Sequence, residues 1–241
     1  MDLEQTYIST SQVPVLVWTK SSSLREHLFH LLSVWAEEAC VDLSLQRQAP
    51  PFAGGAAPGG ILFLDAEGLE DLPSEGLEQR RHTALVVVSA DKRTAIQAFR
   101  RHPTAFLKPS AGYRSLRQAM DQCFPFWRQG LQWIDLPFRR DRVRIPLCQL
   151  HCVEAEGRES ILYCAGGQMR ASYPLGKLED ALPSPPFFRC QRGFLVHLGA
   201  VEAMSGGALV LKGDHRTIPV SRQQIKEIQQ ALHQWQAARG D

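Results

Sequence analysis

The sequence predicts two domains of different class, a doubly wound α/β domain followed by a mainly β domain. In the first half, short apolar runs alternate with amphipathic helical segments, which is typical of a parallel sheet covered by helices on both faces. In the second half, short strand-like runs separated by glycine turns replace this alternation. The length of 241 residues suits two compact domains.

Five apolar runs in the first half predict the strands of the parallel sheet. Each run is short and ends at polar residues, as expected for a strand buried on both faces. They cover residues 13–18, 41–45, 61–64, 85–88 and 105–107. Apolar residues at helical spacing predict helices over residues 24–39, 94–101 and 113–124, and the segment 49–60, rich in Ala, Pro and Gly, predicts a loop.

Seven short runs predict strands in the second half. They cover residues 142–147, 151–155, 160–165, 167–173, 194–197, 208–212 and 216–220. Glycines between the runs supply the turns. We expect one domain over residues 13–125, a linker over 126–137 and a second domain over 138–241.

Charge is distributed unevenly between the two halves. Residues 1–136 contain 13 Lys and Arg against 15 Asp and Glu, and residues 137–241 contain 14 against 10, so the net charges are −2 and +4. A basic second half is compatible with phosphate binding.

The cysteines and the apolar runs indicate a cytoplasmic protein. The six cysteines show no paired framework, no signal pattern opens the chain, and no apolar run reaches the roughly 20 residues that span a bilayer. We therefore expect reduced thiols and no membrane partner.

Three polar residues follow three of the predicted parallel strands. Asp65, Ser89 and Lys108 each stand at a carboxyl end, where doubly wound sheets carry their functional residues. This set resembles the receiver domain of response regulators over residues 13–125, with the flavodoxin-like or CheY-like fold. The resemblance implies that Asp65 accepts a phosphoryl group, that Ser89 and Lys108 contact it, and that a sensor histidine kinase is a partner.

The receiver pattern is incomplete after the first strand. Receivers carry a pair of acidic residues there to hold magnesium, whereas this chain has Trp18-Thr19-Lys20. Magnesium prefers oxygen ligands that include carboxylates, so we expect no Mg²⁺ cofactor at Asp65 and no other cofactor. The resemblance then implies a degenerate receiver that dimerises through the face formed by residues 94–124.

Two arginine motifs stand out in the second half, at residues 187–197 (FFRCQRGFLVH) and 218–222 (IPVSR). Together with the strand around Ile145, an acidic turn at 153–155 and a short helix over 175–182, they resemble the LytTR family of DNA-binding domains over residues 138–238. The resemblance implies that loop arginines read double-stranded DNA. Gln191 stands where this family commonly has histidine, so no consensus target is carried over.

The resemblance assigns DNA-contacting roles to particular residues. Arg192 and Arg222 would bond guanine or clamp phosphate, and Arg158 is a third candidate by its position near the Gly157 turn. Candidates for neighbouring phosphate contacts are Arg189, Gln191, Ser221 and Gln223. We therefore predict a sequence-specific transcription regulator that acts as a homodimer, independently of phosphorylation.

Two alternative functions are also compatible with the sequence. Cys148, Cys152 and Cys164 could form a redox or metal-sensing site, although in a strand Cys148 and Cys152 would share one face with His151 opposite. The basic half could instead bind an acidic protein without binding DNA. An enzyme is not expected, because the sequence contains no Gly-rich phosphate loop and no hydrolase or zinc-protease motif.

Overall fold

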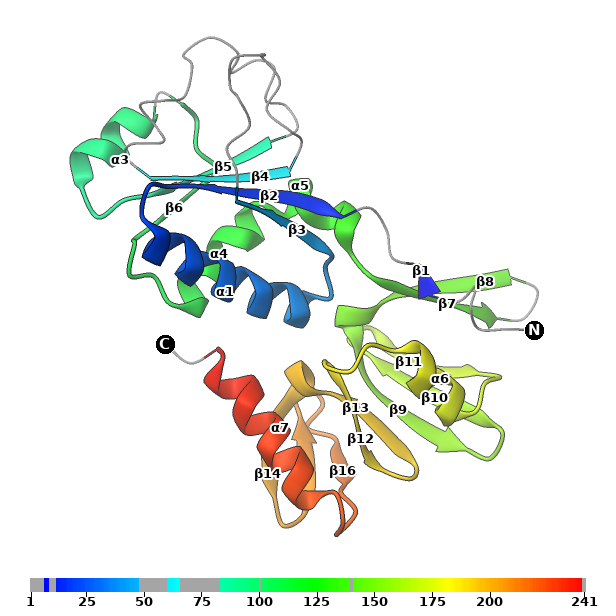
Figure 1. The fold of residues 1–241 in the computed structure, drawn as a ribbon. Helices are drawn as coiled ribbons and strands as arrows, with labels where there is room; N and C mark the ends of the chain where they lie inside the picture. Colours follow the sequence, from blue (N-terminus) through cyan, green and yellow to red (C-terminus); the bar gives the residue numbers. More distant parts are fainter. Residues whose placement is uncertain are drawn as a thin grey trace. The chain divides into compact units, whose positions relative to one another are not determined.

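The computed structural model describes residues 7–8, 12–47, 60–65, 83–99, 101–138 and 141–239. The chain divides into two compact units, an N-terminal unit built mainly of residues 10–131 and a C-terminal unit built mainly of residues 132–238 (Figure 1). The loop expected over 49–60 lies outside the described residues except for Gly60. No helix of the described part is long and apolar enough to cross a membrane.

A five-stranded parallel sheet forms the centre of the N-terminal unit. Its strands are β2 (Val13–Trp18), β3 (Leu43–Gln46), β4 (Gly60–Leu64), β5 (Thr83–Val88) and β6 (Ala105–Leu107). Their order is β3-β2-β4-β5-β6, and every neighbouring pair is parallel. This is the strand order of flavodoxin-like doubly wound sheets, so the fold class predicted for the first half is confirmed.

Helices bury the faces of this sheet. They are α1 (Ser22–Ala39), α3 (Lys92–Phe99), α4 (Tyr113–Gln122) and the short α5 (Phe124–Trp127). Figure 1 shows α1 and α4 on the same face of the sheet. Helix α1 buries Leu28, Leu32 and Trp35, which share one helical face. Every residue of β4 and β5 is buried, which explains why these strands are uninterrupted apolar runs.

The C-terminal unit consists mainly of antiparallel strands, as predicted. They are β7 (Trp133–Phe138), β8 (Asp141–Pro146), β9 (Leu150–Glu156), β10 (Glu159–Cys164), β11 (Gly167–Ala171), β12 (Phe187–Gln191), β13 (Phe194–His197), β14 (Val201–Ser205), β15 (Ala208–Leu211) and β16 (Thr217–Pro219). The sheet orders are β1-β7-β8, where β1 is Tyr7–Ile8, then β11-β10-β9-β13-β12 and β14-β15-β16. Two helices, α6 (Leu175–Ala181) and α7 (Ile225–Ala237), complete the unit.

The two faces of the five-stranded antiparallel sheet bury different cores. Because side chains alternate across a strand, the neighbours Leu195 and Val196 on β13 point to opposite faces. Leu195 packs in a first core with Val153, Leu162 and the buried face of α6. Val196 packs in a second core with Leu209 and the buried face of α7. The sheet is therefore sandwiched and held from both sides.

Three strands of the C-terminal unit differ from the sequence prediction. The sequence predicts no strand at β7, β12 or β14, and β7 occupies part of the segment expected as a linker. In β14 only Val201 is buried, so its apolar signal is weak. Residues 153–155, expected as an acidic turn, lie inside β9, and the turn itself is at 157–158.

A buried carboxylate in the β7–β8 pair is matched by an arginine. Asp135 lies directly across from Arg144 in the antiparallel register and is buried. Nε and Nη2 of Arg144 donate to the two carboxylate oxygens, each over 2.9 Å. These hydrogen bonds hold the pKa of the Asp135 carboxyl below its usual value.

We expect Arg144→Gln to destabilise the protein at neutral pH, because Asp135 would lose its guanidinium partner. The folded-state pKa of Asp135 lies below its unfolded value of about 3.9, so the stabilisation is present above that pH and is lost as the pH falls through the folded-state pKa. Urea unfolding should therefore separate the variant from wild type at about pH 7, and the gap should narrow below about pH 4. Arg128→Gln, at an exposed arginine, is the control, and equal stability at neutral pH would contradict the assignment.

Candidate nucleic-acid interface

Two hairpin turns of the C-terminal unit lie at the same end of its central sheet (Figure 1). The β9–β10 turn is at residues 157–158 and the β12–β13 turn at 192–193. Strand β13 lies between β9 and β12, and the backbone N–H of Ala155 donates to the carbonyl of Gly193 over 2.8 Å. The end of β9 is thereby fixed beside the start of β13.

A third connection joins the same end through the backbone. Residues 221–224 link β16 to α7, and the N–H of Ser221 donates to the carbonyl of Cys190 over 3.0 Å. This hydrogen bond brings together the two arginine motifs, which are distant in the sequence. We call the end of the unit that carries residues 157–158, 192–193 and 221–224 the loop edge.

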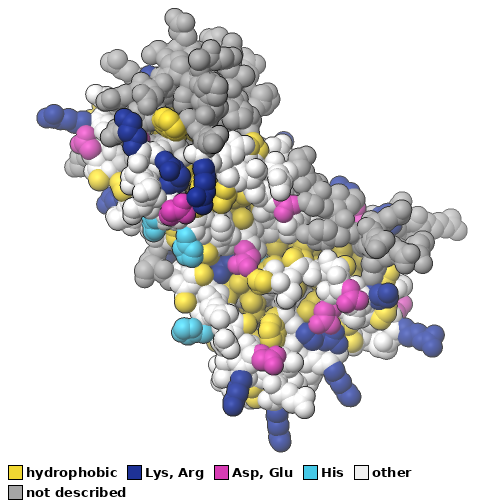
Figure 2. Space-filling model, viewed as in Figure 1, with side chains coloured by type: hydrophobic (Ala, Val, Ile, Leu, Met, Phe, Trp, Pro, Cys, Tyr) yellow, Lys and Arg dark blue, Asp and Glu magenta, His cyan; other side chains and the backbone are white. Residues whose placement is uncertain are grey.

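Basic side chains project from the loop edge. Arg158, Arg192 and Arg222 are all exposed, and Figure 2 shows Lys and Arg side chains projecting at this end of the C-terminal unit. The predicted contacts Gln191 and Ser221 are half-buried beside them, and Gln223 is exposed. The structure thus gathers on one edge residues that come from separate parts of the chain.

Arg189 contacts protein groups instead of projecting into solvent. Its Nε donates to the carbonyl of Gln191 over 2.7 Å, Nη1 pairs with Glu179 on α6, and Nη2 donates to the carbonyl of Arg192. The guanidinium therefore fixes the backbone of the β12–β13 turn that presents Arg192. Sequence reasoning missed this role, because Glu179 lies in a different element with no shared local pattern.

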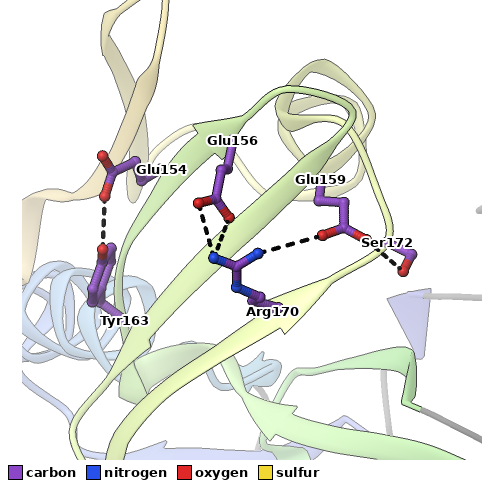
Figure 3. Close-up of polar contacts among 6 residues, drawn as sticks. All are labelled: Glu154, Glu156, Glu159, Tyr163, Arg170 and Ser172. Atoms are coloured by element: carbon purple, nitrogen blue, oxygen red, sulfur yellow. Dashed lines mark hydrogen bonds and ion pairs between the residues drawn. The ribbon is translucent and has the colours of Figure 1, made fainter.

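A second cluster that sequence reasoning missed surrounds the β9–β10 turn (Figure 3). Nη2 of Arg170 on β11 lies 2.8 Å from a carboxylate oxygen of Glu156, and Nη1 lies 3.9 Å from one of Glu159. The hydroxyl of Ser172 also donates to Glu159, over 3.3 Å. The two glutamates that flank the turn are thus both held by one arginine.

In the N-terminal unit, the predicted strand-end residues share one edge of the sheet. Asp65 follows β4, Ser89 follows β5 and Lys108 follows β6, and these strands are neighbours. The buried Thr19 donates its hydroxyl to a carboxylate oxygen of Asp65 over 2.5 Å. Its backbone carbonyl in turn accepts from the Arg25 guanidinium. Asp65 therefore has a neutral hydroxyl as its neighbour from the end of β2.

Ser89 is used in a local turn at the start of α3. Its hydroxyl oxygen accepts from the N–H of Asp91 over 3.0 Å. The Asp91 carboxylate in turn accepts from the N–H groups of Arg93 and Thr94, each over 3.2 Å, and these backbone hydrogen bonds lower the pKa of Asp91. Ser89 thus supports the capped helix start, and Lys108 is exposed.

The residues at this edge do not fit a magnesium site. Magnesium binding in proteins relies on carboxylate and other oxygen ligands, but Thr19 and the cation Lys20 follow β2. In the described ranges, no group of three or more His, Cys, Asp or Glu side chains could hold a metal ion. No metal-assisted phosphoryl transfer is therefore assigned to Asp65.

The cysteines proposed as an alternative sensor site do not converge. Cys148 lies in a 3₁₀ helix (Leu147–Gln149), so the expectation that it shares a strand face with Cys152 is wrong. Cys148 and Cys164 pack against the first core, whereas Cys152 is in the second. Burial raises the pKa of Cys152 to about 12 and that of Cys190 to about 11, so both stay protonated thiols at neutral pH.

Comparisons with known proteins bear on both units. Residues 141–233 match the family model described as the LytTr DNA-binding domain. The comparison with curated proteins found no match. The chain is similar to a solved LytTr DNA-binding domain from Bacillus cereus, at 20% identity over 42% of this chain and 95% of that chain, with a TM-score of 0.37. It is also similar to a CheY-like response regulator from Mesorhizobium loti, at 17% identity over 46% of this chain and 98% of that chain, with a TM-score of 0.35.

The family match agrees with the antiparallel C-terminal unit, and the strand order β3-β2-β4-β5-β6 identifies the N-terminal fold. The chain therefore joins a unit with the flavodoxin-like doubly wound fold to a unit of which residues 141–233 match the LytTr DNA-binding domain family.

Proposed function

We propose that the protein is a sequence-specific transcription regulator that binds double-stranded DNA through the loop edge. The observation that carries this proposal is the convergence of three exposed arginines, from three separate connections, on one end of a sheet buried on both faces. A guanidinium can bond guanine O6 and N7 together, or clamp a phosphate. We assign the protein no catalytic activity and place it in the cytoplasm, in the same compartment as the DNA that it would bind.

The basic and polar residues at and beside the loop edge have distinct roles in this proposal. Arg192 and Arg222 contact bases, and Arg158 contacts a base or a phosphate from the neighbouring turn. Gln191, Ser221 and Gln223 lie next to these arginines in the chain and are suited to phosphate contacts, which fix the register of the protein on the duplex. Arg189 acts from inside the unit by holding the β12–β13 turn.

The N-terminal unit offers a surface for a homodimer. Ile96 and Phe99 on α3 are 67% and 64% exposed, and Phe106 on β6 is 40% exposed. The rings of Phe99 and Phe106 lie 5.4 Å apart. Exposed apolar groups that cluster mark interaction sites. A second copy covering this patch would link two DNA-binding domains and raise their joint affinity through effective concentration.

DNA binding in this proposal does not depend on phosphorylation. Thr19 and Lys20 follow β2 at the chain positions where the resemblance to receivers expects acidic residues that hold magnesium. Without a metal to neutralise charge, phosphoryl transfer to Asp65 would be slow. A sensor histidine kinase is therefore not required for DNA binding. The alternative of a protein-interaction module without DNA binding would show as binding by acidic proteins and no selectivity among DNA fragments.

We expect Arg192→Ala and Arg222→Ala each to weaken binding to the preferred DNA by about 1–3 kcal/mol, because each would remove a bidentate contact. The preferred sequence is first selected from genomic fragments with the full-length protein, and affinities are then measured by fluorescence anisotropy at fixed salt. Lys212→Ala is the control, because it removes a positive charge from the turn after β15, at the far end of that strand from the loop edge. Undiminished affinity in both arginine variants would refute the assignment.

We expect Asp65→Asn to bind the selected DNA within about twofold of wild type, a difference well below 1 kcal/mol. Incubating wild type with a small phosphoryl donor and Mg²⁺ should leave both its mass and its affinity unchanged. Arg192→Ala is the positive control in this assay, because it is expected to lose affinity. A stable mass increase that is absent in Asp65→Asn, together with a change in affinity, would show that phosphorylation regulates the protein.

We expect Phe99→Glu to convert the dimer to a monomer, because a carboxylate in the apolar patch would be desolvated at the interface. Sedimentation velocity of the full-length protein measures the change. Gln97→Glu adds the same charge at an exposed position of the same helix and should stay dimeric. A Phe99→Glu variant that sediments like wild type would rule out this surface.

A further inference from the structure

The turn that presents Arg158 has an acidic residue on each side. Glu156 ends β9 and Glu159 begins β10, and the two are paired directly across the strands. Like charges that face each other in this way are unfavourable. They also place two carboxylates next to a residue whose proposed role is to meet DNA. A cation beside the hairpin would offset part of this negative charge.

Arg170 supplies that cation from the adjacent strand. Arg170 is paired with Ile161, and Ile161 is paired with Glu154. Residues paired directly across strands lie on one face of the sheet, as do residues two apart in a strand. The Arg170 side chain therefore lies on the same face as Glu156 and Glu159. Figure 3 shows both carboxylates directed toward its guanidinium.

The cluster is too exposed to be explained by stability. The side chains of Arg170, Glu156 and Glu159 are 64%, 44% and 45% exposed. Ion pairs in such positions typically contribute little to folding. The cluster instead determines which charges the loop edge presents to solvent.

Arg158 is the cation that lies next to these glutamates in the chain. It lies between them in the chain, two residues after Glu156 and one before Glu159. In the described part of the chain, the Arg158 side chain forms no hydrogen bond or ion pair. With Arg170 removed, both carboxylates would be left beside Arg158, their neighbour in the chain.

We propose that Arg170 is a positioning residue for DNA binding, which engages Glu156 and Glu159 so that neither pairs with Arg158. This inference rests on the proposed function. Arg170 lowers the combined charge of the two glutamates from −2 to −1 and holds both beside the turn, and Arg158 is left free to contact DNA.

The first experiment compares Arg170→Gln with wild type in the full-length protein. We expect affinity for the selected DNA to fall about three- to tenfold at about 50 mM salt, and the difference to shrink near 300 mM, because exposed charges are screened. Urea unfolding should be unchanged, and Arg170→Lys should recover part of the affinity. Lys212→Gln removes the same charge at the end of β15 that is far from the loop edge. It should lower the affinity less than Arg170→Gln does. An Arg170→Gln variant that binds like wild type would overturn the inference.

Two double-mutant cycles separate positioning from a general charge effect. Glu156→Gln should raise affinity more in the Arg170→Gln background than in wild type, whereas a general effect would give equal factors in both. Arg170→Gln should cost little affinity once Arg158→Gln is present, because its effect passes through Arg158. The inference would be overturned if, in both cycles, each substitution changed the affinity by the same factor in the two backgrounds.

The same data distinguish this inference from the proposed function. If wild type shows no selective DNA binding, the proposed function fails and takes the inference with it. If wild type binds and Arg192→Ala loses affinity while Arg170→Gln does not, the proposed function is supported and the inference alone is overturned.

Discussion

The burial of β13 on both faces is the constraint on which the C-terminal unit depends. Leu195 faces one core and Val196 the other, and β9 and β12 pair with the strand on either side. A strand held from four directions cannot shift its register without exposing one of its two apolar sets. The turns at 157–158 and 192–193 are therefore fixed relative to each other. The Ser221 to Cys190 backbone hydrogen bond extends this rigidity to the third connection.

Residues of one type have different roles in this unit, according to what surrounds them. Arg158, Arg192 and Arg222 end in solvent, whereas Arg189 and Arg170 end on protein groups. Arg189 holds the backbone of one turn through two carbonyls and Glu179, and Arg170 holds the acidic flanks of another. A loop that recognises a ligand must be presented by a rigid support. At two of the three connections an arginine supplies that support.

The sequence carries the fold more clearly than the contacts of the site. Uninterrupted apolar runs are sufficient to predict β4 and β5, and the parallel order then places Asp65, Ser89 and Lys108 on one edge. The grouping of Arg192 with Arg222 came from family resemblance, since no periodicity links them. Strand β14 was missed because little of it is buried. The roles of Arg189 and Arg170 were missed because their partners lie on other elements, where no local pattern records the contact.

The fold of the N-terminal unit does not depend on the residues that follow its strands. Its stability comes from strands buried in the middle of the sheet, and these are unaffected by which residues follow the strand ends. Thr19 and Lys20, which follow β2, supply no carboxylate ligand for a metal, and the sheet forms regardless. Thr19 then satisfies Asp65 with a hydroxyl. On the surface of this unit, the exposed Phe99 and Phe106 form an apolar patch. In the proposed function, this patch contributes a dimer contact, and the loop edge binds DNA without a phosphorylation switch at Asp65.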